Sequence, residues 1–257
     1  MKMRKSAFIA LLVAICIPLA GYFLLKQLSK GAVDIPKHYF YDSVSIKNGK
    51  TDTVWHTVNS PEFTNQLGKQ VTFDSAKGKI LVVNFFFTRC PSICPKLTAS
   101  MKRLQDSYVK NPEIVQFISV SVDPEHDSVP VLRKFADKYK VNHDSWWMVT
   151  GNKTAVYDFA IQQMKANIAD PGIDTAFIHT EDFFLLDTNR IIRGWYNGLD
   201  TNEVAKLAGD IPILMLEKSD KSPSVLRQFI PVLPLIFIGI AIVIVIMIFL
   251  QRSKNKN

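Results

Sequence analysis

Two cysteines four residues apart, Cys90 and Cys94, are the side chains of this sequence best suited to metal binding or redox chemistry. They follow a mostly apolar run, Ile80–Thr88, whose lack of alternation predicts a central strand covered on both faces. A helix is expected to begin at the cysteines, where side chains four residues apart share one face and the N-terminus favours a thiolate. The pair could therefore hold one soft metal ion or exchange a disulfide. A purely structural disulfide is the alternative, but so short a loop would add little stability.

A histidine could complete the site. His179 lies directly before a predicted strand at Phe183–Asp187, and in a thioredoxin-like topology that loop lies beside the start of the cysteine helix. A merely structural histidine is the alternative. Two cysteines and one histidine form a soft donor set that suits Cu(I), zinc or iron–sulfur chemistry. Structural zinc and iron–sulfur clusters usually require a fourth protein ligand, so copper is the best remaining candidate.

The elements that must position these residues alternate between strand and helix. The expected strands are a short hairpin from Gln66 to Asp74, then Ile80–Thr88, Ile114–Val122, Trp146–Thr150, Phe183–Asp187 and Ile191–Tyr196. Helices are expected after the cysteines and after three capping sites, which are Asp127 or Ser128, Asn152, and Asp200 with Glu203. The first three of these helices have an apolar stripe, and the stripe of the helix after Asn152 consists of Tyr157, Ala160, Ile161, Met164 and Ile168. This order predicts an α/β fold with parallel main strands and a mixed sheet, which fits a thioredoxin-like domain.

Two segments, Ser6–Leu25 and Phe229–Leu250, are too apolar for a soluble core. Each has about the 20 residues that a membrane-spanning helix needs, which exceeds the apolar region of a signal peptide. Cys16 within the first is expected to be an ordinary residue of that helix. The predicted organisation is an N-terminal tail and transmembrane helix at 1–28, a thioredoxin-like copper-binding domain at 37–216, a linker at 217–228, a C-terminal transmembrane helix at 229–250 and a basic tail at 251–257.

The net charge of +8 does not indicate nucleic-acid binding, because six of the positive charges lie in the two terminal tails. Basic residues confined to the ends of apolar spans are typical of membrane orientation. Two spans with cytoplasmic tails would place the domain on the periplasmic or extracytoplasmic side of the cell membrane. We therefore expect a lipid membrane, and no nucleic acid, among the partners.

Three separated motifs resemble those of the Sco/SenC family. Members of this family are thioredoxin-fold copper proteins that assemble the copper site of cytochrome c oxidase. Asn84–Pro95 is similar to the family segment F-x-T-x-C-P-x-x-C-P, and Ser119–Ser128 is similar to its S-V-D-P-x-x-D-T segment. His179-Thr180 matches the position of its metal-binding histidine. The resemblance covers about Gly68 to Leu207. The chain departs from the family in its second span and in Ile178, where many members have an aspartate.

The resemblance implies that Cys90, Cys94 and His179 are ligands of copper, as Cu(I) or Cu(II), and that the two cysteines can form a disulfide. It implies two partners, the copper-binding subunit of cytochrome c oxidase and a thiol reductant protein. The expected function is a membrane-anchored metallochaperone that delivers copper, or reduces the site cysteines, during oxidase assembly. Such a protein is a binding protein more than an enzyme. The main alternative is a thiol–disulfide oxidoreductase in which Cys90 attacks and Cys94 resolves, and a peroxidase-like thiol enzyme has less support.

Overall fold

The computed structural model describes residues 16, 19, 21–23, 35–47, 50–166 and 180–217. The chain divides into two compact units, and Ile35–Glu217 forms the unit that contains the cysteine pair. Almost all of the predicted spans Ser6–Leu25 and Phe229–Leu250 lies outside the described residues. Within the residues that are described, no helix combines the length and apolar character needed to cross a bilayer.

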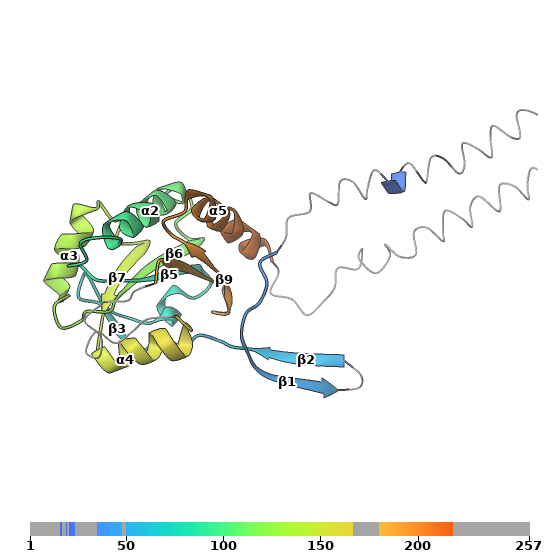
Figure 1. Cartoon of the computed structure of the whole chain (residues 1–257), viewed down its shortest axis with the longest axis horizontal. Helices are drawn as coiled ribbons and strands as arrows, with labels where there is room; N and C mark the ends of the chain where they lie inside the picture. The colour runs from blue at the N-terminus through green and yellow to red at the C-terminus, as the bar shows by residue number, and fades with distance from the viewer. Residues whose placement is uncertain are drawn as a thin grey trace, which may run out of the picture. The chain divides into compact units, whose positions relative to one another are not determined.

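A seven-stranded mixed sheet forms the centre of the Ile35–Glu217 unit, in the order β4-β3-β7-β6-β5-β8-β9 (Figure 1). Strands β5, β6 and β7 are parallel, and β8 runs antiparallel to β5, so the predicted mixed sheet is confirmed. The strands are β3 (Phe63–Asn65), β4 (Gln70–Val71), β5 (Ile80–Phe86), β6 (Val115–Ser121), β7 (Trp146–Thr150), β8 (Asp182–Leu186) and β9 (Ile192–Asn197).

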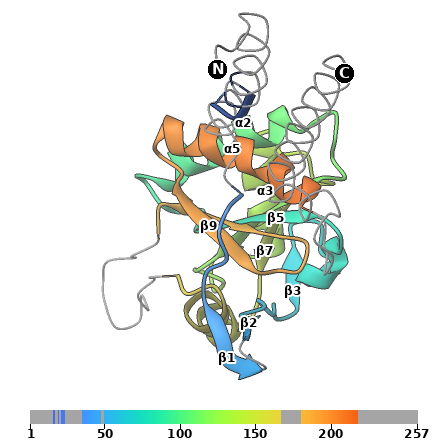
Figure 2. The ribbon, with the colours of Figure 1, turned by 90° about the vertical axis from the view of Figure 1, so that its right-hand side faces the viewer.

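Helices cover both faces of this sheet. Figures 1 and 2 show α2 and α5 together on one face, where Tyr108 Oη at the end of α2 donates to the Ala208 carbonyl of α5 at 2.6 Å, and α4 on the other face. As predicted, Asn152 caps α4 and Asp200 caps α5. The helical segments are the short 3₁₀ helix η1 (Phe73–Ala76), α2 (Cys94–Ser107), α3 (Val129–Lys138), α4 (Lys153–Asp158) with a π-helical continuation (Phe159–Gln163), and α5 (Thr201–Leu216).

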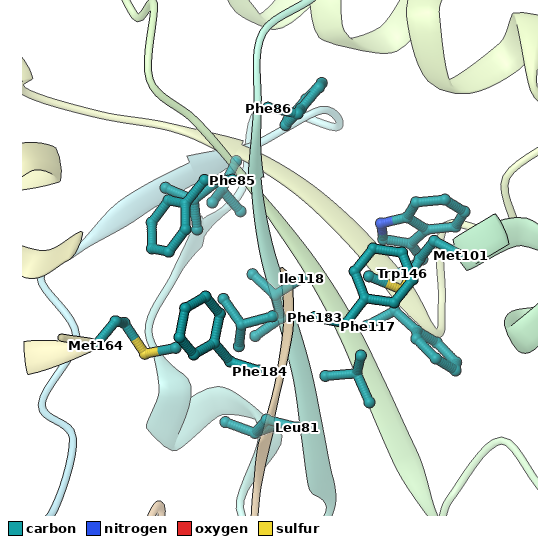
Figure 3. Packing of buried hydrophobic residues seen from close by; sticks show 14 of the residues in the cluster. Leu81, Phe85, Phe86, Met101, Phe117, Ile118, Trp146, Met164, Phe183 and Phe184 are labelled. Atoms are coloured by element: carbon teal, nitrogen blue, oxygen red, sulfur yellow. The ribbon is translucent and has the colours of Figure 1, made fainter. Parts of the chain in front are cut away.

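The buried core has two layers, one on each side of the central strands (Figure 3). In one layer Phe85 of β5 packs near Phe184 and Phe159, with ring centroids 6.1 and 6.2 Å apart. In the other layer Phe117 of β6 packs near Trp146, with centroids 6.5 Å apart. Because both faces of β5 and β6 are covered, all of their residues are buried, which explains the missing alternation in the sequence.

Several predicted boundaries were wrong. Strand β5 ends at Phe86, two residues before the predicted end, because the chain turns there toward the cysteines. The first hairpin is β3–β4, which lies earlier in the chain than predicted and has Gly68 with φ of 76° in its turn. Ile161, predicted for the apolar stripe of α4, is 41% exposed, since the helix widens to a π-helix at Phe159 and changes the face that each residue occupies. Ile168, predicted for the same stripe, lies outside the described residues.

A second, two-stranded sheet was not predicted. It consists of β1 (Tyr41–Lys47) and β2 (Lys50–Trp55), which pair antiparallel. The signal for it was Asn48-Gly49, a dipeptide typical of tight β-hairpin turns. Figure 1 shows this hairpin extending away from the seven-stranded sheet.

One buried arginine fastens both ends of the Ile35–Glu217 unit. Arg193 of β9 donates from Nη1 to the carboxylates of Asp187, at 3.0 Å, and Glu217, at 2.6 Å. Its Nη2 donates to the carbonyl of Pro36 at 2.5 Å, and its Nε donates to the Lys37 carbonyl at 3.3 Å. The segment that enters the unit and the residue that ends α5 are therefore held at the same guanidinium.

Two glycines provide a matched test of the packing. A methyl group at Gly198 would lie 2.6 Å from Leu97 Cδ2 and 2.7 Å from Phe183 Cζ, whereas a methyl group at Gly209, inside α5, would contact nothing within 4 Å. Gly198→Ala should therefore lower the free energy of unfolding by about 1–3 kcal/mol through overpacking. Gly209→Ala should raise it by about 0.5–1 kcal/mol through helix propensity. Thermal unfolding followed by circular dichroism measures both, and shifts of the same sign would contradict this packing.

Candidate metal and redox centre

The cysteine pair lies in the connection between β5 and α2. Cys94 is the first residue of α2, whereas Cys90 lies in the turn before the helix, so the predicted helix start at the cysteines is found at the second one. The expected closeness is nevertheless found, because the amide of Cys94 donates to Cys90 Sγ at 3.4 Å. Both residues are thiols in the structure, with Cys90 5% exposed and Cys94 0% exposed. The turn therefore folds the first sulfur back over the N-terminus of α2.

The local sequence explains why the helix begins at the second cysteine. Pro95 occupies the first turn of α2, where an amide hydrogen has no helical acceptor and its loss costs nothing. A proline at that position also disfavours a helical start further upstream. The amide of Cys94 at this helix start donates to Cys90 Sγ.

The surroundings shift the pKa values of the two thiols in opposite directions. Burial alone would raise the pKa of Cys90, but hydrogen bonds from the backbone and side chains of Cys94 and Ser92 outweigh it and hold that pKa below its ordinary value. Burial raises the pKa of Cys94 well above its ordinary value, and the neighbouring charges of Cys90 and Asp127 act in the same direction. Cys90 is consequently the more acidic thiol of the pair, and Cys94 is the less acidic one.

A buried carboxylate holds the turn that leads to Cys90. Asp127, which is fully buried, accepts hydrogen bonds from the Thr88 amide at 3.1 Å, from the Thr88 hydroxyl, and from the Ser121 hydroxyl at 2.5 Å. The sequence analysis proposed Asp127 or Ser128 as the cap of α3, and the N-cap is Ser128. Asp127 instead joins the turn after β5 to the end of β6.

A second carboxylate of the same loop holds the next residue. Asp123 accepts from Arg89 at Nη2, 2.7 Å away, and at Nε, 3.2 Å away. His126 Nδ1 lies 2.7 Å from the other oxygen of Asp123. Thr88 and Arg89, the two residues before Cys90, are thus each held by an acid of the β6–α3 loop. Both acids lie in the motif Ser119–Ser128, but their role could not be predicted from that motif.

The four described histidines all contact other groups. Besides His126, His143 lies 3.1 Å from both Gln66 and Asp137, His56 lies 2.9 Å from Asp42, and His38 stacks on Trp55 with ring centroids 4.9 Å apart. His179 lies outside the described residues. In ranges 35–47, 50–166 and 180–217, no three histidine, cysteine or acidic side chains are grouped to hold a metal ion.

The difference in acidity predicts selective alkylation at Cys90. With Cys16 replaced by serine, iodoacetamide should modify Cys90 first, and the rate should fall only when the pH drops below the lowered pKa of that thiol. Cys94 should remain unmodified throughout the neutral range because its pKa is raised. Mass spectrometry of peptides after timed alkylation measures both rates. Faster modification of Cys94, or a midpoint for Cys90 at or above the ordinary value of about 8.5, would contradict the geometry.

The buried carboxylate gives a second prediction. Asp127→Asn should place an amide N–H₂ against the hydroxyl and amide donors around it, which costs about 1–3 kcal/mol of unfolding free energy. It should also speed hydrogen exchange at the Thr88 amide. The matched control is Glu125→Gln in the same loop, whose exposed side chain should leave stability within about 0.5 kcal/mol. Equal effects of the two substitutions would show that Asp127 does not hold the turn.

Comparison with known proteins identifies a family and several relatives of this chain. The family model SCO1/SenC matches residues 51–211. The SCO1 protein homolog of Bacillus subtilis (strain 168) is 34% identical over 161 residues, covering 62% of this chain and 83% of the relative. Among solved structures, BsSco, a member of the Sco family of cytochrome c oxidase assembly proteins with a disulfide switch, has 33% identity and a TM-score of 0.57, covering 65% of this chain and 98% of that chain.

A further structure, ScoI of Bradyrhizobium japonicum with copper bound, has 24% identity and a TM-score of 0.50, covering 62% of this chain and 99% of that chain. This likeness concerns the fold alone. The fold is a thioredoxin-like mixed α/β sheet, as predicted. Because the family model matches more than half of the chain and the Bacillus subtilis relative is 34% identical over 161 aligned residues, the chain belongs to the SCO1/SenC family.

Proposed function

We propose that this protein is a membrane-anchored copper chaperone that binds copper through Cys90, Cys94 and His179 and serves the assembly of the copper site of a cytochrome c oxidase. The observation that carries the proposal is the 3.4 Å contact between the Cys94 amide and Cys90 Sγ, which brings the two thiols to one helix terminus. Soft thiolates and an imidazole are donors that suit copper. The oxidase as partner rests on family membership, since the relative BsSco is described as an oxidase assembly protein.

The pairing of β5 and β8 supports His179 as the third donor. Val83 of β5 lies opposite Phe184 of β8, and the two strands run antiparallel. The residues just before β8 therefore lead toward the carboxyl end of β5, the end from which the cysteine turn departs. Thr180, the residue after His179, is buried and donates to the Asp182 carboxylate at 2.6 Å, so the chain is held at that end of the strand.

The cysteines also support a redox role, which is the reduction of a disulfide in the oxidase subunit. The Cys90 thiolate would attack one sulfur of that disulfide, and the other sulfur of the subunit would leave as a thiolate and take up a proton. The Cys94 thiol would then lose its proton, attack the mixed disulfide and release the second partner thiol. The product would be a Cys90–Cys94 disulfide and a reduced partner, so a thiol reductant protein must restore the pair.

General thiol–disulfide oxidoreductase activity is the second candidate function. It is favoured by the opposite pKa shifts of the two thiols, lowered at Cys90 and raised at Cys94, which suit an attacking and a resolving sulfur. The three residues between the cysteines distinguish this chain from the two-residue spacing of thioredoxin-type reductases. Activity toward a general disulfide substrate should therefore be low.

The cellular setting is part of the proposal. The apolar segments Ser6–Leu25 and Phe229–Leu250 would anchor the chain in the cell membrane with both basic tails in the cytoplasm. The domain would then face the periplasmic or extracytoplasmic side.

Copper affinity of the reduced full-length chain tests the proposed ligands. Cys90→Ser, Cys94→Ser and His179→Ala should each weaken copper binding by more than the roughly 10–100-fold expected when a group that only orients a ligand is lost. Affinity should also fall as the pH is lowered, because protons compete for the thiolates. Competition with a chromophoric Cu(I) chelator measures these changes.

The matched control is His143→Ala, because His143 is already engaged by Gln66 and Asp137. It should retain the affinity of the parent, and we expect the same of His126→Ala. If His179→Ala binds copper like the parent while the parent reduces a general protein disulfide rapidly, the oxidoreductase function would replace the chaperone function.

A further inference from the structure

The hairpin β1–β2 presents an apolar face that nothing in the described part of the chain covers. Val44 pairs with Thr53 and Ile46 pairs with Thr51, so these four side chains share one face of the hairpin. Val44 is 50% exposed and Ile46 is 76% exposed. The opposite face carries Ser43, Ser45 and Asp52 together with Val54. Such alternation normally marks a strand with one buried face.

This exposed surface continues past the base of the hairpin. Tyr41 is exposed, and the neighbouring Phe40 lies near Trp195 of β9, with ring centroids 6.2 Å apart. Both of these rings are more than one third exposed. We call Phe40, Tyr41, Val44, Ile46 and Trp195 the hairpin apolar surface.

The base of the hairpin lies beside the point where both ends of the unit are fastened. The Tyr39 amide donates to the Ile192 carbonyl at 3.1 Å, next to Arg193 in the chain. Arg193 in turn binds the Pro36 carbonyl and the Glu217 carboxylate. The hairpin apolar surface therefore begins close to where the chain enters and leaves the unit.

The segments that connect the unit to the two apolar segments are short enough to keep a bilayer within reach of this surface. Nine residues, 26–34, separate the first apolar segment from the unit, and eleven residues, 218–228, separate the unit from the second. Fully extended, these linkers span at most about 30–40 Å. The seven residues of β1 span roughly 20 Å. A bilayer that holds both apolar segments would lie within reach of the hairpin.

We propose that the hairpin apolar surface lies in the interfacial layer of the lipid bilayer, as a third contact besides the two apolar segments. This inference rests on the membrane anchoring in the proposed function. Tyrosine and tryptophan are typical of the membrane interface, and Val44 and Ile46 add aliphatic area. In the sequence, Lys47 and Lys50 stand on either side of Asn48-Gly49, and lysine is a residue type that anionic headgroups attract. Aromatic, aliphatic and basic residues together favour lipid over a second protein surface.

Fluorescent labels on the two faces of the hairpin test this inference. The full-length chain, with Cys16, Cys90 and Cys94 replaced by serine and its fold verified by circular dichroism, would carry either Ile46→Cys or Ser45→Cys and an environment-sensitive dye. Ser45 is the matched control, because it is the exposed neighbour on the opposite face. The chain would be reconstituted in vesicles of phosphatidylcholine and phosphatidylglycerol.

Doxyl-labelled lipids should quench the dye at position 46 several-fold more than the dye at position 45, and aqueous iodide should show the reverse order. Equal accessibility of both dyes to iodide would overturn the inference. Shielding of position 46 from iodide without quenching by lipid would also overturn it, and would indicate a second copy or a protein partner. An alkaline wash separates the two proposals: release of the chain from the vesicles overturns the anchoring as well, whereas retention with an exposed dye at position 46 overturns this inference alone.

Discussion

A carboxylate removed from water must receive hydrogen bonds, and the buried carboxylate of Asp127 receives them from Thr88 and Ser121. This requirement joins the turn after β5 to the end of β6. The neighbouring pair of Asp123 and Arg89 repeats the connection one residue closer to Cys90. The central parallel strands are rigid, and the hydrogen bonds of the two acids hold the turn in place beside them. The position of the first sulfur thus depends on side chains more than 30 residues away in the sequence.

The two cysteines differ because of where the helix begins. Starting α2 at Cys94 leaves Cys90 in a turn, where amide hydrogens face its sulfur and lower its pKa, while Cys94 enters the core and its pKa rises. One arrangement therefore serves two kinds of chemistry, since a ready thiolate is both a soft metal ligand and a nucleophile. This geometry supports the proposal that the protein binds copper when reduced and exchanges electrons through a disulfide.

Sequence patterns predicted the main strands and the mixed sheet, because a mostly apolar run without alternation, such as β5, is typical of a strand covered on both faces. They also predicted that Cys90 and Cys94 would lie close together, since spacing fixes local geometry. The role of Asp127 could not be predicted in this way. In the sequence, an aspartate that caps α3 looks the same as a buried aspartate that binds another segment, and only the hydrogen bond from Thr88 distinguishes the two. The hairpin β1–β2 was missed although Asn48-Gly49 signalled it, because its strands alternate apolar and polar residues and contain no mostly apolar run like that of β5. His179 and both predicted spans remain sequence-based predictions.

The proposed copper site is built from the sulfurs of Cys90 and Cys94, and X-ray absorption at the copper edge tests it most directly. The reduced full-length chain, loaded with one equivalent of copper, should show sulfur scattering from two donors together with imidazole scattering. Replacing Cys90 by serine should remove one sulfur donor. A copper environment without sulfur, or one that is unchanged in the Cys90→Ser variant, would contradict the account.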